Sequence, residues 1–407
     1  MTNASRHPLS PWFALGGLLA FVGIAVGFAS VIVAFLGRSP AASVATPESL
    51  ETVSKCEAPA VGIKDAVSAP FSSQEVHFSS ADGHAYNPNW SADGKYVAFE
   101  VVRYDGASID LYIASMNRTT PIDAVKVPLW DGSKASGNTP VMSNPTWHPN
   151  GISVFEGSNQ EGTDRLYVYA LGEASATELL NAAQAPGDLT FPTMTPDGRQ
   201  LAFVSSQTGN GDLRIWNRTT NKITQLTNTE ATESFPEYSA NCRHLLFTRQ
   251  QRSTQDLFEL DLVTNTERAI VSGSGDQTRP IYAADGSIVY FTSERGADLW
   301  DIATVDKTGS NKRVIAEDVR LPLRQRPALT PDGRWVAWVS ADPTKDGEIA
   351  LTRLDGTKTV EIPTEYRDCS EPAFTLQNGR VLLAFTFLKA SYADWRGLYV
   401  MDVTDSL

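Results

Sequence analysis

The polar side chains of this chain form none of the familiar catalytic motifs. Its five histidines (His7, His77, His84, His148 and His244) never have the His-Glu-x-x-His spacing that binds zinc. The chain has no Gly-x-Ser-x-Gly nucleophile elbow and no Gly-x-x-x-x-Gly-Lys-Ser/Thr loop to cradle a phosphate. We therefore predict no catalytic residue, no metal ligand and no cofactor, and we favour a binding protein over an enzyme.

Better candidates for chemistry are the residues that directly precede a recurring proline. The seven are Asn87, Asn144, Phe191, Phe235, Arg279, Arg326 and Glu371. Two roles stay open for Arg279, Arg326 and Glu371, which fall in consecutive repeats. They form an ion-paired rim, or the arginines bind the carboxylate of a small anion or peptide tail while Phe191 and Phe235 supply apolar contact.

The prolines belong to a phrase that occurs seven times. Its first copy is Asn87-Pro88-Asn89-Trp90-Ser91-Ala92-Asp93-Gly94, and the repeat prolines are 57, 47, 44, 44, 47 and 45 residues apart. A strand, an Asp-Gly turn and a second strand at such a period are typical of a propeller blade. In a ring the seven pre-proline residues, which we place at the start of each inner strand, converge around one mouth of the central channel.

The repeats also predict how the ring closes. Each reads as four strands, but the seventh lacks a fourth strand, and a spare strand at residues 75–79 precedes the first. We expect this N-terminal strand to complete the last blade, because an open edge exposes unpaired backbone groups. The predicted fold is all-β, a seven-bladed β-propeller. In the fourth repeat Ala240-Asn241-Cys242-Arg243 replaces the Asp-Gly turn, so we expect an altered turn there.

The repeat resembles a known family. Pro-x-aromatic-Ser-x-Asp-Gly-x-x-Val-Ala-Phe followed by Asp-Leu-Tyr-Ile is similar to the TolB-type, WD40-like propeller repeat, over residues 74–407. The third copy, Pro192–Ser205 with Asp212-Leu213-Arg214-Ile215, shows it well. The resemblance implies a propeller, and by analogy an envelope-assembly or scaffolding role.

The N-terminal region predicts a membrane anchor. Residues 12–36 carry no charge, and a helix of that length crosses a hydrocarbon core of about 30 Å. The predicted domains are a tail (1–11), a transmembrane helix (12–36), a linker (37–70) and the propeller (71–407). A signal peptide cleaved near Ala41-Ala42-Ser43 is the alternative, although its apolar region is usually only about 7–15 residues. We expect a single-pass protein with its propeller outside the cytoplasm, on the periplasmic or cell-surface side.

Charge and cysteine content limit the partners. The net charge of -13 argues against nucleic acid, whose phosphates need a basic surface. Three cysteines allow one bridge if the domain lies in an oxidising compartment. The polar loop around Gly132–Gly137, an insertion in the first repeat, is a candidate binding loop. We predict a membrane-tethered scaffold that binds a protein or peptide of the cell envelope. The alternatives are a hydrolase or lyase with its site at the channel mouth, and a structural subunit of a membrane complex.

Overall fold

The computed structural model describes residues 56, 71–104, 106, 108–116, 121–129, 140–159, 161–388 and 395–407. The chain divides into two units, Met1–Glu48 and Ser49–Leu407, and all described residues belong to the second. The predicted transmembrane helix at residues 12–36 and the candidate binding loop around Gly132–Gly137 lie outside them. None of the helices in the described ranges is long and apolar enough to cross a membrane.

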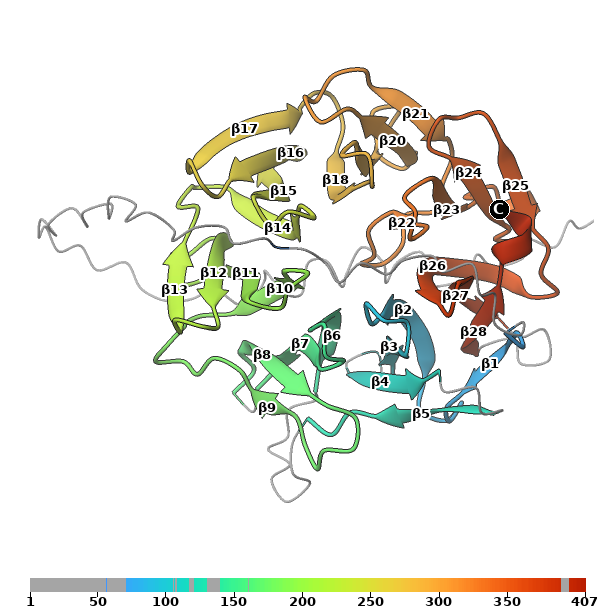
Figure 1. The fold of residues 1–407 in the computed structure, drawn as a ribbon, viewed down its shortest axis with the longest axis horizontal. Coiled ribbons are helices and arrows are strands. Elements are labelled where there is room, and N and C mark those ends of the chain that lie inside the picture. The colour runs from blue at the N-terminus through green and yellow to red at the C-terminus, as the bar shows by residue number, and fades with distance from the viewer. Residues whose placement is uncertain are drawn as a thin grey trace, which may run out of the picture. The chain divides into compact units, whose positions relative to one another are not determined.

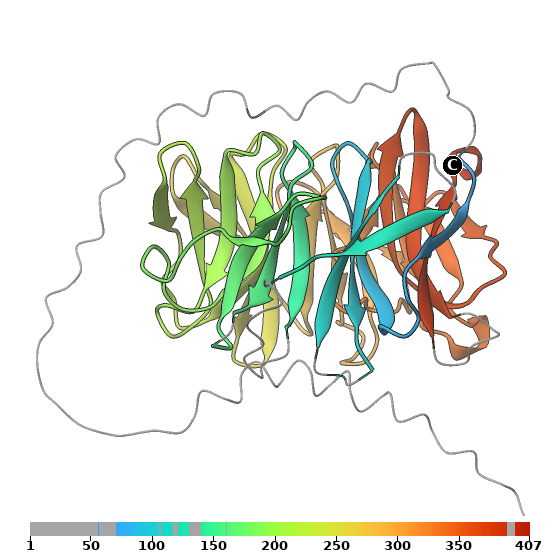
Figure 2. The same cartoon turned by 90° about the horizontal axis from the view of Figure 1, so that it is seen from below.

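The described part of the chain is all-β, as predicted, with its sheets arranged around a common centre (Figure 1). One sheet has eight strands, and its order is β2 (His84–Trp90), β3 (Tyr96–Val102), β4 (Ile109–Ser115), β5 (Ile122–Lys126), β1 (Gln74–His77), β28 (Arg396–Asp402), β27 (Arg380–Leu388) and β26 (Arg367–Gln377). Seen from the side, the strands run next to one another from one face of the ring to the other (Figure 2).

Five further sheets have four antiparallel strands each. The first two contain β6 (Met142–Trp147), β7 (Ser153–Ser158), β8 (Asp164–Tyr169) and β9 (Thr177–Glu178), then β10 (Leu189–Met194), β11 (Gln200–Ser205), β12 (Asp212–Asn217) and β13 (Lys222–Gln225). The third contains β14 (Thr232–Tyr238), β15 (His244–Gln251), β16 (Thr254–Asp261) and β17 (Thr266–Val271). The last two contain β18 (Gln277–Tyr282), β19 (Ile288–Thr292), β20 (Asp301–Val305) and β21 (Arg313–Ala316), then β22 (Ala328–Leu329), β23 (Trp335–Val339), β24 (Ile349–Arg353) and β25 (Thr359–Ile362). Two short 3-10 helices, η2 (Pro343–Lys345) and η3 (Thr404–Ser406), complete the described elements.

The N-terminal strand joins the two ends of the repeat array. Strand β1 pairs antiparallel with β28, in the register Gln74↔Val400 and Val76↔Leu398. It also pairs in parallel with β5, through Val76↔Ile122. The prediction that the N-terminal strand completes the C-terminal sheet is confirmed by this pairing, which covers an edge of β28 that would otherwise be open.

The core lies between neighbouring sheets and recurs with the repeat. The second strand of most sheets carries a phenylalanine that is 0 to 3% exposed: Phe99, Phe155, Phe203, Phe247, Phe291 and Phe385. Burying such a side chain stabilises the fold by roughly 1.5–3 kcal/mol. The outer strands, such as β13 with its pattern of mainly exposed residues, face solvent on their free edge. The inner strands are thereby held as the wall of a central channel.

The hairpin turns explain why the repeat contains Asp-Gly. Gly94 and Gly198 have φ values of 66° and 70°, a conformation that glycine adopts without the steric cost of a Cβ. In the third four-stranded sheet Cys242 takes the glycine position with φ 55°, and its N–H donates to Ser239 O at 2.8 Å. Asn241 Oδ1 accepts from Arg243 N, as Asp93 Oδ1 accepts from Lys95 N. The prediction of an altered turn was wrong, because asparagine supplies the same acceptor.

Candidate functional site

Six of the seven pre-proline residues lie inside the inner strands, not at their first residues as the sequence suggested, whereas Arg326 lies just before β22. Strand β2 begins at His84, three residues before Asn87, because the proline interrupts the ladder without ending the strand. The register shifts between Tyr86 and Asn89, and equivalent shifts occur in β6, β10, β14, β18 and β26. Six of the seven pre-proline residues have φ between 48° and 58°: Asn87, Asn144, Phe191, Phe235, Arg279 and Glu371. Each of these six inner strands therefore bulges at its proline.

Hydrogen bonds between sheets hold these bulges. The N–H of Asn144 donates to Glu100 Oε1 at 2.9 Å, and the N–H of Phe191 donates to Glu156 Oε2 at 2.9 Å. The N–H of Asn87 donates to Glu371 Oε2 at 2.5 Å. A left-handed conformation costs a non-glycine residue about 1–3 kcal/mol, so these bonds to charged acceptors offset a local strain.

The bulges surround a cavity of about 360 Å³ at the centre of the ring, which we call the central pocket. Five of the seven predicted site residues line it: Asn87, Asn144, Phe191, Phe235 and Arg326. The rings of Phe191 and Phe235 lie 4.7 Å apart between centroids and form part of its apolar wall. The structure thus brings together residues that are up to 239 positions apart, from Asn87 to Arg326.

Arg279 and Glu371 do not line the central pocket. The guanidinium of Arg279 is buried and donates to three main-chain carbonyls: Pro322 O at 2.6 Å, Gln325 O at 3.1 Å and Leu323 O at 3.1 Å. Glu371 accepts from the N–H groups of Asn87 and Leu323. These two side chains support the wall from behind, and no ion pair among Arg279, Arg326 and Glu371 occurs in the described part of the chain.

The segment Leu321–Pro327, which we call the channel segment, contributes its residues Arg324–Pro327 to the lining of the central pocket. The inner strand of its sheet starts as an isolated bridge between Val319 and Ser340, leaves the ladder, and resumes only at β22. In Figure 1 this orange segment reaches toward the centre just ahead of β22. Gln325 Nε2 donates to Pro88 O at 2.6 Å, and Arg326 Nη2 donates to Pro236 O at 2.6 Å. The channel segment therefore contacts sheets on several sides of the ring.

A group of buried charges surrounds the channel segment. Arg324 Nη1 lies 4.0 Å from Glu100 Oε2 and 3.8 Å from Glu156 Oε1. Burial raises the pKa of Glu371 to about 7 and raises that of Glu100 above its usual range. Burial lowers the pKa of Arg279 to about 10. Desolvation thus sets the direction of these three shifts, whereas the burial of Arg324 is outweighed by the surrounding carboxylates, which raise its pKa.

Sequence reasoning missed Arg324, Glu100 and Glu156. Signals for them were present. Glu100 interrupts the apolar run from Val97 to Val102, and Glu156 follows Val154 and Phe155 in the same way. The extra length of the channel segment shows in the spacing of 47 residues between Pro280 and Pro327, against 44 for the preceding pair. An acidic residue in a strand buried on both faces indicates a partner in the interior.

Two cysteines are joined. Cys56 and Cys242 form a disulfide with their Cα atoms 5.7 Å apart, whereas Cys369 is buried with a free thiol. Cys56, Asp197 and Cys242 are also the one group of possible metal ligands in the described ranges. The disulfide occupies both sulfurs, so neither is a thiolate ligand. The bridge that the sequence left open attaches residue 56 to the hairpin turn between β14 and β15.

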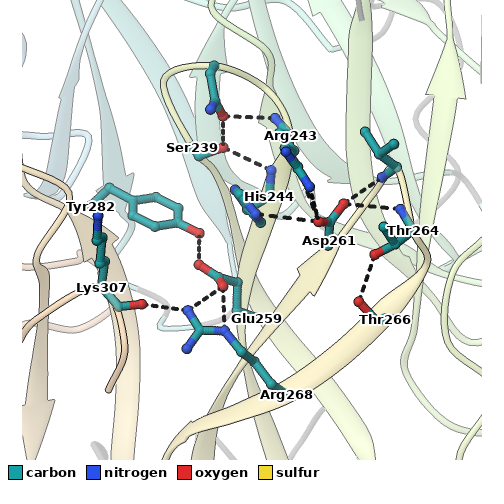
Figure 3. A network of polar contacts seen from close by, with 12 residues as sticks. Ser239, Arg243, His244, Glu259, Asp261, Thr264, Thr266, Arg268, Tyr282 and Lys307 are labelled. Carbon is teal, nitrogen blue, oxygen red and sulfur yellow. Dashed lines mark hydrogen bonds and ion pairs between the residues drawn. The ribbon is translucent and has the colours of Figure 1, made fainter. Parts of the chain in front are cut away.

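A second polar network, away from the central pocket, lies on the sheet of β14, β15, β16 and β17 (Figure 3). Glu259 accepts from the Tyr282 hydroxyl at 2.7 Å and from Arg268 Nε at 2.8 Å, and Arg268 also reaches Lys307 O. Asp261 accepts from Arg243 Nη2 at 2.8 Å. The hydrogen bond from Arg243 lowers the pKa of Asp261 to about 2. These contacts tie β16 to its neighbours.

Comparison with known proteins agrees with this fold. Residues 188–299 match the family model described as a TolB beta propeller domain. No curated protein matches the sequence. The solved structure of TolB from Acinetobacter baumannii is similar with a TM-score of 0.50 and 17% identity, covering 70% of this chain and 67% of that one.

Two enzymes of known structure are also similar. A puromycin hydrolase has a TM-score of 0.56 and 12% identity over 79% of this chain, but only 53% of its own. An oligogalacturonate lyase from Vibrio parahaemolyticus has a TM-score of 0.52 and 13% identity, covering 83% of this chain and 93% of that one. At such identities the likeness concerns the fold. Residues 188–299 thus match a TolB beta propeller model, and over the described residues the sheets have a fold similar to that of these propeller structures.

Proposed function

We propose that this protein is a membrane-tethered, extracytoplasmic propeller that binds a protein or peptide of the cell envelope. The observation that carries the proposal is the central pocket, whose wall is built from the bulges of the inner strands. Counting the eight-stranded sheet as two blades gives the seven blades of the repeat. A cavity of about 360 Å³, whose exposed lining is more polar than apolar and includes several apolar side chains, suits one extended segment of a partner with its main-chain polar groups.

The disulfide supports the location of the propeller outside the cytoplasm. Bridges such as Cys56–Cys242 form and persist in oxidising compartments and are rare in the cytosol. Residues 12–36 would provide the single-pass anchor, and the linker 37–70 would tether the propeller to the membrane. The partner would then be displayed or held at the membrane surface.

A pocket-filling substitution tests the binding function. Thr146 lines the central pocket on β6, so Thr146→Tyr fills space there with a side chain that strands tolerate well. Full-length protein in detergent is used to capture its partners from an envelope extract, and we expect Thr146→Tyr to reduce the retained partner about tenfold. Thr177→Tyr, on the exposed strand β9 of the same sheet, is the matched control. Equal retention by both variants and the wild type would refute a role of the pocket.

An enzyme with its site at the channel mouth is the second candidate function. Glu237 lines the central pocket, and burial raises its pKa, which is a property of many general acids. The similar structures include a hydrolase and a lyase. Turnover of a glycan or lactone that is lost in Glu237→Gln would favour this candidate over the scaffold, as would a metal ion that copurifies with the full-length chain. A third candidate is a structural subunit of a membrane complex, joined through residues 12–36.

A further inference from the structure

The guanidinium of Arg324 forms no hydrogen bonds in the described ranges, although it lies near two buried carboxylates. A guanidinium carries five N–H donors, and within the described ranges none of those on Arg324 has an acceptor at hydrogen-bond distance. Its nearest acidic partners, Glu100 Oε2 and Glu156 Oε1, lie 4.0 and 3.8 Å away. The side chain is 28% exposed, and the space it faces is the central pocket. Arg324 thus presents an unsaturated cation to the cavity.

The other arginines of the channel provide a contrast. Arg279 uses its donors on three carbonyls of the channel segment. Arg326, which lines the central pocket beside Arg324, has one bond to Pro236 O and lies 3.6 Å from Glu237. Of these three guanidinium groups, Arg324 therefore has the most N–H donors left for a ligand. Its neighbours in the channel segment form hydrogen bonds with other sheets and hold its backbone in place.

The charges that line the pocket favour an anion. Arg324, Arg326 and Glu237 are its charged lining residues, so two positive groups and one negative group face the cavity. Glu100 and Glu156 lie behind Arg324 and do not line the pocket. An ammonium group entering here would meet two guanidinium groups. A carboxylate would instead meet Arg324 on the side facing the cavity, while Glu100 and Glu156 stay on its other side.

The rest of the wall is suited to an organic ligand. Trp90, Phe191, Met194, Leu329 and Phe374 supply apolar surface around the cavity. An inorganic anion would leave that surface exposed to water, whereas the end or side chain of a peptide would cover it. The chemistry that fits both parts of the wall is a carboxylate joined to apolar groups.

We propose that the central pocket binds its ligand through a carboxylate group, which Arg324 of the channel segment recognises by paired hydrogen bonds. The inference rests on the peptide-binding function proposed above and names the chemical group that this function requires. Bidentate geometry is specific to arginine, because its planar fork matches the two oxygens of a carboxylate. The carboxylate comes from a chain terminus or from an aspartate or glutamate side chain.

Defined peptide pools test the proposal. Full-length wild-type protein in detergent is immobilised and offered three pools of N-acetylated hexapeptides, randomised over uncharged residues. The first pool ends in a free carboxylate, the second in an amide, and the third in an amide preceded by a glutamate. We expect at least one carboxylate pool to be retained about tenfold more than the neutral amide pool, as charge-assisted hydrogen bonds imply. Retention of the first pool alone identifies a chain terminus, and retention of the first and third identifies any carboxylate.

Substitutions assign the recognition to one residue. Arg324→Gln should abolish the tenfold preference, and Arg324→Lys should keep only a part of it, because lysine retains the charge but not the fork. Arg334→Gln is the matched control, since Arg334 belongs to the same sheet but is 73% exposed on a hairpin turn outside the pocket. Near-ultraviolet circular dichroism confirms that each variant folds, and Arg324→Lys decides the question should Arg324→Gln not fold.

The two proposals fail in different ways. Equal retention of all three pools by the wild type, with a loss in Thr146→Tyr, would overturn carboxylate recognition and leave peptide binding intact. A tenfold preference that persists in folded Arg324→Gln and Arg324→Lys would overturn the role of Arg324. Retention of every pool no better by the wild type than by Thr146→Tyr would overturn peptide binding at the central pocket, and carboxylate recognition with it.

Discussion

Glu259 and Glu100 both lie on buried strands of the ring, yet their carboxylates are bonded differently. Glu259, in the outer network of Figure 3, accepts from the Tyr282 hydroxyl with one oxygen and from Arg268 with the other. Glu100, in the channel, accepts from Asn87 and Asn144 with one oxygen only. Its Oε2 has no hydrogen bond in the described part of the chain, and Arg324 stays 4.0 Å away.

The difference concerns hydrogen bonding, and within the described ranges unbonded buried carboxylate oxygens also occur away from the central pocket, at Asp110 and Asp256. An unsatisfied buried polar atom costs about 1–3 kcal/mol, so a fold that needed only stability would close the gap between Glu100 and Arg324. The outer network does close such gaps, and it links β16 to the sheet that contains Tyr282. Residues that break a local rule without a structural gain are expected at functional sites. This contrast is consistent with the assignment of the channel as the binding site.

The largest effect is expected at Arg279, whose two terminal nitrogens donate to three buried carbonyls of the channel segment. Arg279→Leu leaves the carbonyls of Pro322, Leu323 and Gln325 without their donor in a buried setting. We expect the free energy of unfolding to fall by about 3–5 kcal/mol, because each buried carbonyl left without a donor costs about 1–3 kcal/mol. Urea unfolding followed by tryptophan fluorescence measures it. A loss below about 1 kcal/mol would show that the channel segment does not depend on Arg279.

The two regions should also respond to pH with opposite sign. Burial raises the pKa of Glu371 to about 7, from an ordinary value of 4.5. The folded chain therefore holds a proton between those values that the unfolded chain releases, and the free energy of unfolding falls as the pH rises through this window. The loss is about 3 kcal/mol, at roughly 1.4 kcal/mol per pKa unit. Asp261, whose pKa is about 2, instead adds stability as the pH rises from about 2 toward 4.

Unfolding at pH 5 and pH 8 separates the contribution of Glu371. Wild type should lose stability between the two values, and Glu371→Gln should lose much less, because glutamine does not titrate. Asp261→Asn is the matched control and should keep the slope of the wild type, since Asp261 is ionised at both pH values. The assignment to Glu371 would be wrong if both variants and the wild type gave one slope.

The fold could be predicted from the sequence because each repeat contains its own strand and turn signals. The Asp-Gly turns, the apolar second strands and the spare N-terminal strand predict the all-β sheets and the pairing of β1 with β28 without any long-range information. The turn at Cys242 shows the limit of such signals. At this turn position, where other repeats have glycine, Cys242 adopts φ 55° and its N–H donates to Ser239 O.

The site was accessible only in part. Asn87, Asn144, Phe191, Phe235 and Arg326 were found because a closed ring brings equivalent positions together. Arg324 was not, because it has no equivalent in the other repeats: the seven-residue channel segment leaves the ladder between Val319 and β22. The path of this segment depends on the hydrogen-bond acceptors that it meets in the channel, such as Pro88 O and Pro236 O, and these belong to distant repeats. Residues 12–36 and the loop around Gly132–Gly137 remain predictions.

The smallest effect is expected in the outer network, at Arg243. Its side chain is 48% exposed, and Asp261 keeps the N–H groups of Val263 and Thr264 when the guanidinium is removed. Water replaces the lost donor at such a site, so Arg243→Ala should lower the free energy of unfolding far less than Arg279→Leu does. Its pKa readout is larger, because the hydrogen bond from Arg243 is the main cause of the low pKa of Asp261, which should rise toward 3.8 in a carboxyl NMR titration. A loss of stability comparable to that of Arg279→Leu would contradict the contrast between the regions, since it would mean that an exposed ion pair holds the ring as firmly as the buried hydrogen bonds of Arg279.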